Sequence, residues 1–243
     1  CLHKVGVTDI FGYPGGAVIP IYDEIYSFEK IKHYFARHEQ GAVHAADGYA
    51  RSTGKVGVAI ATSGPGATNL ITGIATAFMD SVPVVYITGN VAQNLIGKDS
   101  FQEVYTTGIT MPITKHNFVV REVDKIADTI REAFRIASSG RKGPVLIDFP
   151  KDVTIAEYDF EEKKSEEKKS EEFKDENLLD EIAKLINESK KPVIYSGGGV
   201  ISSNASEELR QVIDKSSIPA CNSIMGIGNL DYNKYFLGMA GMH

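Results

Sequence analysis

The 243-residue chain is longer than a typical single domain, and with 42% hydrophobic residues it can bury a sizeable core. Its net charge of −6 gives no basic footprint for nucleic acid, no apolar run approaches the roughly 20 residues of a membrane span, and no signal peptide is visible. The two cysteines, Cys1 and Cys221, lie far apart without metal-ligand spacing, which argues against a disulfide framework and predicts a cytoplasmic protein.

Apolar segments alternate with helical patterns along the first two thirds of the chain. The predicted strands lie at 9–12, 31–36, 56–61, 83–88, 117–120 and 145–149. The predicted helices lie at 17–26, 39–51, 69–79 and 124–137, the last with Asp124 as its N-cap. This alternation is typical of a doubly wound parallel sheet, so the predicted fold class is α/β. Between 89 and 111 the periodicity lapses, which is typical of a functional loop or of disorder.

A charged stretch divides the chain. Residues 161–172 mix glutamate, lysine and serine without an apolar face, which indicates a solvated linker. We therefore expect one domain at 1–155, a linker at 156–173 and the start of a second Rossmann-like α/β domain at 174–243. Helices at 178–186 and 207–216, strands at 192–196 and 218–221 and a glycine loop after 196 are predicted there. Both ends look cut, so we expect a fragment of a longer protein.

Glu39 stands between the predicted strand 31–36 and the helix that follows it. The helix is indicated by an apolar stripe of Ala42, Ala45, Ala46, Tyr49 and Ala50. At this end of a parallel sheet ligands bind, and a carboxylate there meets backbone N–H groups and the positive end of the helix dipole. A glutamate in this position can equally cap its own first turn, so position alone leaves both interpretations open.

Two glycine-rich segments also follow predicted strands. Ser63-Gly64-Pro65-Gly66 can hold an anion at a helix N-terminus or simply form a tight turn, since it matches neither a Walker loop nor the dinucleotide fingerprint. Gly197-Gly198-Gly199 allows the backbone to approach either a phosphate or the next helix.

Histidines and lysines add little. His38, His44, His116 and His243 form no His-x-x-x-His pair with a carboxylate, so no metal site is predicted. Lys98 and Lys151 lie in predicted loops, where a solvated surface lysine is the alternative to a ligand.

Taken together, several segments resemble the large, catalytic subunit of thiamine-diphosphate-dependent acetolactate synthases. The resemblance covers nearly the whole chain. It is carried by Phe11–Ala17, Arg37–Ala42, Thr62–Asn69, Ser100–Glu103, Thr114–Asn117, Gly143–Asp152 and Gly241–His243. The segments around Glu39 and Ser63 are shared widely among thiamine-diphosphate enzymes, whereas Phe101-Gln102-Glu103 and Pro150-Lys151-Asp152 narrow the match to the acetolactate branch.

This resemblance implies a mechanism. The glutamate that matches Glu39 hydrogen-bonds a nitrogen of the aminopyrimidine ring and favours the imino tautomer, which removes the thiazolium proton to form the nucleophilic ylid. The ylid attacks pyruvate, carbon dioxide leaves, and the enamine adds to a second 2-keto acid, the first step of branched-chain amino-acid synthesis. The cofactor acts as the electron sink.

The resemblance also implies roles for other residues. Pro14, Gly15, Gly16 and Gln102 would contact thiamine diphosphate, Gln102 with a catalytic role. Ala17, Phe101 and Lys151 would line the substrate channel, and the Lys151 cation would attract keto-acid carboxylates. A largely structural FAD would contact Lys115, Arg141, Gly197, Gly198, Gly199, Ser223, Met225, Met242 and His243.

Two departures and one gap qualify the match. Ala92-Gln93-Asn94 stands where many relatives carry Pro-Arg-Arg, and Ser223 replaces a threonine. The Gly-Asp-Gly…Asn segment that binds Mg²⁺ and the diphosphate is absent, so we expect the fragment alone to be inactive. A homodimer or tetramer is implied, as is a possible regulatory small subunit. The alternatives are another thiamine-diphosphate 2-keto-acid decarboxylase or oxidase, and a non-catalytic nucleotide-binding scaffold.

Overall fold

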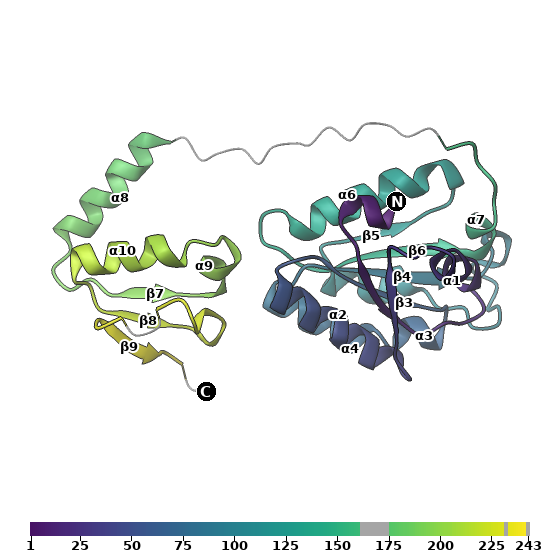
Figure 1. The fold of residues 1–243 in the computed structure, drawn as a ribbon, viewed down its shortest axis with the longest axis horizontal. Helices are drawn as coiled ribbons and strands as arrows, with labels where there is room; N and C mark the ends of the chain where they lie inside the picture. The colour runs from purple at the N-terminus through teal and green to yellow at the C-terminus, as the bar shows by residue number, and fades with distance from the viewer. Residues whose placement is uncertain (161–174, 231–232, 242–243) are drawn as a thin grey trace. The chain divides into compact units, whose positions relative to one another are not determined.

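A computed structural model describes residues 1–160, 175–230 and 233–241. The chain forms two compact units, Cys1–Glu161 and Glu162–His243, which are described separately (Figure 1). The charged stretch 161–172, assigned above to a linker, lies outside the described residues.

A six-stranded parallel sheet forms the centre of the first unit. Its strands are β1 (Asp9–Gly12), β2 (Lys32–Phe35), β3 (Gly57–Ala61), β4 (Val84–Asn90), β5 (His116–Val119) and β6 (Val145–Pro150). They are arranged in the order β2-β1-β3-β4-β6-β5, and every pair is parallel. Strands β3, β4 and β6 are buried at every position, as continuous apolar runs predict. The predicted α/β class is confirmed.

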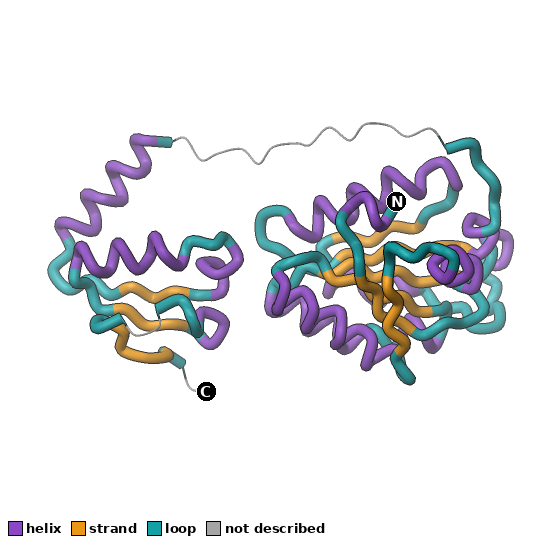
Figure 2. The backbone as a smooth tube through the Cα atoms, in the orientation of Figure 1, coloured by secondary structure: helices purple, strands orange, loops and turns teal. Residues whose placement is uncertain are grey.

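Helices cover both faces of this sheet (Figure 2). They are α1 (Ile19–Tyr26), α2 (Glu39–Thr53), α3 (Pro65–Thr68), α4 (Ile71–Asp80), α5 (Thr106–Thr110), α6 (Ile126–Ser138) and α7 (Lys151–Thr154). On one face, α1 and α6 pack on residues such as Ile60 and Ile147. On the other, α2 and α4 pack through small side chains against residues such as Ala59 and Tyr86.

Several sequence predictions for the first unit need correction. The helix expected at 69–79 is confirmed as α4, which begins two residues later at Ile71, but the short helix α3 precedes it where no helix was predicted. The expected loop at 89–111 contains the short helix α5. Asp124 is not an N-cap: it lies in a 3₁₀ turn and pairs with the neighbouring Lys125 at 3.0 Å, and no side chain caps α6. Ala45, assigned to the buried stripe of α2, is exposed.

The second unit contains a smaller parallel sheet in the order β7-β8-β9. Its elements are β7 (Ile194–Ser196), β8 (Ala220–Asn222), β9 (Phe236–Met239), α8 (Glu176–Glu188), α9 (Gly198–Ser202) and α10 (Ser206–Ser216). The glycine segment after β7 was predicted as a loop but opens the short helix α9. The core centres on Ile213, Ala220 and Leu230. Across the part of the chain that the structure describes, no helix is long and apolar enough to cross a bilayer.

Candidate functional site

Glu39 is the first residue of α2, directly after β2, and its side chain is turned inward. Only 9% of Glu39 is exposed. The residue before it, His38, is the N-cap, and its Nδ1 accepts a hydrogen bond from the Gln40 N–H at 3.1 Å. Because His38 serves as the cap, the interpretation of Glu39 as the cap of its own helix does not hold, and its carboxylate is available for another purpose.

The Glu39 carboxylate is held from the loop that follows β3. Asn69 Nδ2 donates a hydrogen bond to Glu39 Oε2 at 2.9 Å. The other oxygen, Oε1, faces the backbone of Gly66, where an added Cβ would lie 3.3 Å from it. Oε1 receives no hydrogen bond from any residue that the structure describes. The carboxylate therefore has one engaged oxygen and one available acceptor.

Glycines bring the loops after β1 and β3 together beside Glu39. A Cβ on Gly15 would lie 2.5 Å from Thr62 Cβ, and one on Gly66 would lie 2.7 Å from Thr62 Cγ2. Thr62 Oγ1 also accepts a hydrogen bond from the Ala17 N–H at 3.3 Å. Only glycine permits this spacing, because any side chain would push the two loops apart.

The long loop after β4 reaches the same place. Gln102 has a φ of +57°, and its carbonyl oxygen would lie 2.6 Å from a Cβ on Gly64. Glu103 closes the loop by accepting hydrogen bonds from the Gly97 N–H and from the Ser100 N–H, the latter at 2.9 Å. The ring of Phe101 is 87% exposed. Gln102 is thus brought to the loop that faces Glu39, while Phe101 projects into solvent.

Lys151 is exposed at the start of α7, immediately after β6. Its neighbour Asp152 accepts hydrogen bonds from the backbone N–H of Gln93 at 3.0 Å and from Gln93 Nε2 at 3.1 Å. Since all strands are parallel, the segments after β1, β2, β3, β4 and β6 lie at one edge of the sheet, the edge where ligands bind in such folds. Gly15, Glu39, Gly66, Gln102 and Lys151 share that edge.

Tyr22 of α1 lies close enough to Glu39 for their charges to interact. Burial, and to a smaller extent the charge of Glu39, raises the pKa of the Tyr22 phenol. Burial lowers the pKa of His33, whose ring meets that of Tyr22 edge-on at 4.9 Å between centroids. Tyr22 Oη and His33 Nε2 are buried without a hydrogen-bond partner among the described residues. Both groups therefore stay uncharged near neutral pH, and the neighbour of Glu39 on the side of α1 is a neutral phenol.

Asp148 is a buried acidic group that the sequence analysis missed. It lies in β6, is 1% exposed, and accepts hydrogen bonds from Thr88 Oγ1 and Asn90 Nδ2, both at 2.6 Å. Burial raises the pKa of its carboxyl to about 6, against the lowering effect of those two donors. The sequence feature that could have indicated this buried group is the single aspartate in the otherwise apolar predicted strand 145–149.

Lys115 and Arg141 lie at the opposite edge of the sheet. They precede β5 and β6, whose amino ends face away from Glu39. Lys115 Nζ donates to the carbonyls of Ile136 and Ser139, the latter at 2.7 Å, at the end of α6. Arg141 Nε donates to Ser81 Oγ at 2.8 Å. The structure does not bring these two predicted cofactor contacts to the edge that carries Glu39.

The remaining predicted residues lie in the second unit. A Cβ on Gly198 would lie 3.1 Å from Met225 O, and one on Gly197 would lie 3.4 Å from Ser223 Oγ. Gly197, Gly198, Ser223 and Met225 thus meet after β7 and β8, while a Cβ on Gly199 would meet open space. The close approach of Met225 to the backbone of Gly198 is enough to explain a glycine at this position. Met242 and His243 lie outside the described residues.

Comparison with known proteins agrees with this arrangement. Residues 1–109 match the thiamine pyrophosphate enzyme N-terminal TPP-binding domain, and residues 179–243 match the central domain of thiamine pyrophosphate enzymes. Over its whole length the chain is 50% identical to the acetolactate synthase large subunit of Cyanidium caldarium, covering 43% of that protein. It is also 50% identical over its whole length to a probable acetolactate synthase large subunit of Methanocaldococcus jannaschii, covering 42% of it.

The chain therefore spans about two fifths of the length of these curated relatives. Two domain models match its two units, and half of its residues are identical to those of the relatives over the full alignment. From these matches we conclude that the chain belongs to the thiamine pyrophosphate enzyme family and is similar along its whole length to acetolactate synthase large subunits.

Proposed function

We propose that the protein containing these residues is the catalytic subunit of an acetolactate synthase. It would decarboxylate pyruvate and join the remaining two-carbon unit to a second 2-keto acid, the first step of branched-chain amino-acid synthesis. The observation that carries the proposal is the buried Glu39 carboxylate, with Oε2 held by Asn69 and Oε1 open beside Gly66. Similarity to acetolactate synthases over the entire chain supports the reaction class.

The residues present fit the aminopyrimidine half of thiamine diphosphate. A ring nitrogen that carries a proton needs an acceptor, and Oε1 of Glu39 is an unused acceptor on a nearly buried carboxylate. Gly16 borders open space in the turn after β1, and Gly15 and Gly66 let that turn and the loop after β3 approach each other beside Glu39. When bound, the cofactor supplies the electron sink that keto-acid decarboxylation requires.

Glu39 would hold the ring by accepting that hydrogen bond and would take part in moving protons to and from the ring. Its low exposure limits competition from water for the same oxygen. Gln102 and the neighbouring Phe101 would border the reacting groups, and Pro14 and Ala17 would flank the turn after β1. The exposed Lys151 cation would draw a keto-acid carboxylate toward this edge of the sheet.

The described residues do not form a binding site for Mg²⁺. These 243 residues contain no Gly-Asp-Gly segment, and the described part of the chain offers no group of three His, Cys, Asp or Glu side chains that could hold a metal ion. No step above uses the metal. We propose that residues outside these 243 hold Mg²⁺ and the diphosphate.

FAD would be held by residues of the second unit, where Gly197, Gly198, Ser223 and Met225 meet. Asn222 supports this proposal, because its Nδ2 is buried there without a hydrogen-bond partner among the described residues. Lys115 and Arg141 are committed to carbonyl and hydroxyl partners at helix ends, so their part in FAD binding would require those bonds to break.

The decisive test is Glu39→Gln in the complete protein, with Glu29→Gln, an exposed glutamate, as matched control. Acetolactate formation from pyruvate should fall by about a hundredfold or more, because the amide of glutamine lacks the charge and basicity that proton transfer requires of the carboxylate. The control should keep wild-type rates. Unchanged turnover in Glu39→Gln would favour a non-catalytic scaffold. Release of carbon dioxide by the wild type without formation of acetolactate would favour another keto-acid decarboxylase.

Two further measurements extend the proposal. The 243-residue chain alone should form no acetolactate, and product formed by the purified chain would refute this expectation. Light scattering of the complete protein should give the mass of a homodimer or tetramer, with or without a regulatory small subunit. A cytoplasmic location is proposed from the two widely separated cysteines.

A further inference from the structure

Asn69 lies in the turn between α3 and α4, and its side chain reaches Glu39. Pro65 starts α3 after Gly64, whose φ of +59° turns the backbone, and α3 ends after four residues. Asn69 follows at once, before α4 begins at Ile71. From this position the Asn69 amide donates to a carboxylate thirty residues earlier in sequence, at 2.9 Å.

We propose that Asn69 is a positioning residue, which holds the Glu39 carboxylate so that Oε1 is presented to the ring of the bound cofactor. This inference rests on the proposed function. A glutamate side chain has three rotatable bonds, and one donor on Oε2 selects the rotamer in which Oε1 faces Gly66. Asn69 touches neither substrate nor cofactor in this assignment and acts through Glu39 alone.

The amide chemistry suits this task. An Nδ2 group donates without bringing charge, so the carboxylate remains the single charged group of the pair. An aspartate at 69 would place a second carboxylate against Glu39, and repulsion would turn one of them away. Alanine would leave Glu39 free to rotate. Hydrogen bonds to charged groups are among the stronger ones in proteins, so the loss should be measurable.

The experiment follows exchange of the C2 proton of bound thiamine diphosphate for deuterium, by acid quench and proton NMR, in the complete protein with Mg²⁺ and without substrate. Calorimetry first sets a saturating cofactor concentration for each variant. Asn69→Ala should slow exchange by about tenfold or more, the amount expected for a hydrogen bond to a charged group. In the Glu39→Gln background the same substitution should change exchange by less than about twofold, because its effect passes through the carboxylate.

Thr68→Val is the matched control, since it removes a hydroxyl that donates to Pro65 O at 3.1 Å in the same turn and leaves Asn69 in place. It should leave exchange at the wild-type rate.

Asn69→Asp keeps the size of the side chain and should slow exchange at least as much as alanine does, which guards against a folding defect in the alanine variant. Equal slowing by Asn69→Ala in both backgrounds, or wild-type exchange in Asn69→Asp, would overturn the assignment. If Glu39→Gln itself leaves exchange unchanged, the proposed function fails instead.

Discussion

At the start of α2, His38 and Glu39 divide two tasks. His38 caps the helix, and Glu39 turns its carboxylate toward Asn69 and Gly66. Neither contact partner is near Glu39 in sequence, so the position of the carboxylate depends on how the loop after β3 folds. Asp148 differs in that both of its carboxyl oxygens are engaged, one by Thr88 and the other by Asn90 of the neighbouring strand.

Asp148 should make stability depend on pH. Its pKa is raised to about 6 in the folded state, from an ordinary value of 3.8, so the folded protein binds the proton more tightly. The associated stability is present below the unfolded pKa and is lost as pH rises through 6, by roughly 3 kcal/mol in total. About 2 kcal/mol of that loss falls between pH 4.5 and 7.5.

Asp148→Asn does not titrate, so its stability relative to wild type should increase by about 2 kcal/mol over this pH range. Urea titrations followed by circular dichroism at the two pH values measure the difference. Thr72→Val, at an exposed position of α4, serves as a control and should shift both curves equally. A relative stability of Asp148→Asn that stays constant with pH would contradict the prediction.

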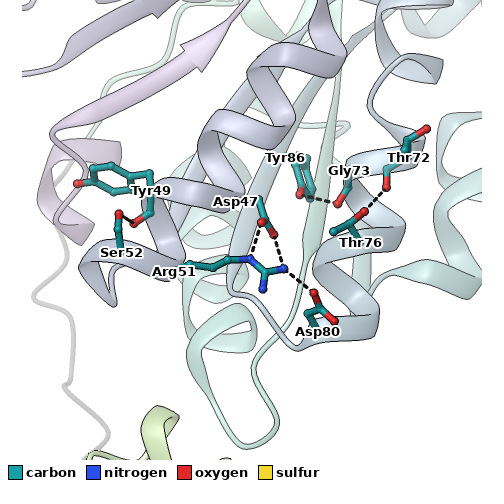
Figure 3. Close-up of polar contacts among 9 residues, drawn as sticks. All are labelled: Asp47, Tyr49, Arg51, Ser52, Thr72, Gly73, Thr76, Asp80 and Tyr86. Atoms are coloured by element: carbon teal, nitrogen blue, oxygen red, sulfur yellow. Dashed lines mark hydrogen bonds and ion pairs between the residues drawn. The ribbon is translucent and has the colours of Figure 1, made fainter. Parts of the chain in front are cut away.

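At the scale of elements, α2 and α4 are joined through one arginine. Arg51 Nε donates to Asp47 at 2.6 Å, and its Nη2 donates to Asp80 at 2.7 Å, so the guanidinium bridges the two helices (Figure 3). The helices can approach because Gly73 faces Val43, where a Cβ would lie 2.3 Å from Val43 Cγ1. Below them Tyr86 Oη donates to Gly73 O at 3.5 Å, and burial raises the pKa of this phenol.

The two carboxylates should respond differently to loss of the arginine. The Asp47 side chain is 9% exposed and Asp80 is 36% exposed. Arg51→Met leaves Asp47 buried without its counter-charge and should cost about 2 kcal/mol. Asp80→Asn removes a surface partner and should cost less than about 1 kcal/mol. Urea midpoints of the two variants give the comparison, and Asp47→Asn combined with Arg51→Met should recover part of the loss. Equal costs would show that the burial of Asp47 is unimportant.

At the scale of the whole molecule, the two units differ in how much core they possess. The first unit has two clusters of buried side chains, one on each face of the sheet. The second unit has a cluster of three fully or nearly fully buried residues, Ile213, Ala220 and Leu230. Its helix α8 has an apolar face with every member exposed, between 39% and 62%: Leu178, Leu179, Ile182, Leu185 and Ile186.

We therefore expect the two units to behave differently when they are produced alone. Residues 1–160 should unfold in a single cooperative thermal transition, because a large apolar surface is buried on both faces of the sheet. Residues 175–243 should bind a hydrophobic dye and unfold gradually, since the described residues of the second unit leave the α8 face uncovered. Circular dichroism melts and dye fluorescence test both statements, and a sharp transition without dye binding for 175–243 would contradict the second.

Much of the architecture follows from local patterns in the sequence. Continuous apolar runs predicted β3, β4 and β6, and helical spacing predicted α1, α2, α6, α8 and α10, because burial of one face leaves a periodic trace in the residues themselves. The alternation of predicted strands and helices also indicated that Glu39 lies at the edge of the sheet where ligands bind. The family match supports thiamine diphosphate as the cofactor. The roles that the resemblance implies for individual residues stay predictions.

The tertiary structure decided what those patterns could not contain. Asn69 meets Glu39 thirty residues away, Gln102 meets Gly64, and Lys115 ends at the opposite edge on the carbonyls of α6. The unpredicted short helix α3 and the missing Asp124 cap have the same origin, since backbone turns and packing override local preference. The sequence by itself determined that Glu39 lies where a strand meets a helix. Only the fold decided which of its oxygens is held and which remains open, because that choice depends on contacts between distant segments.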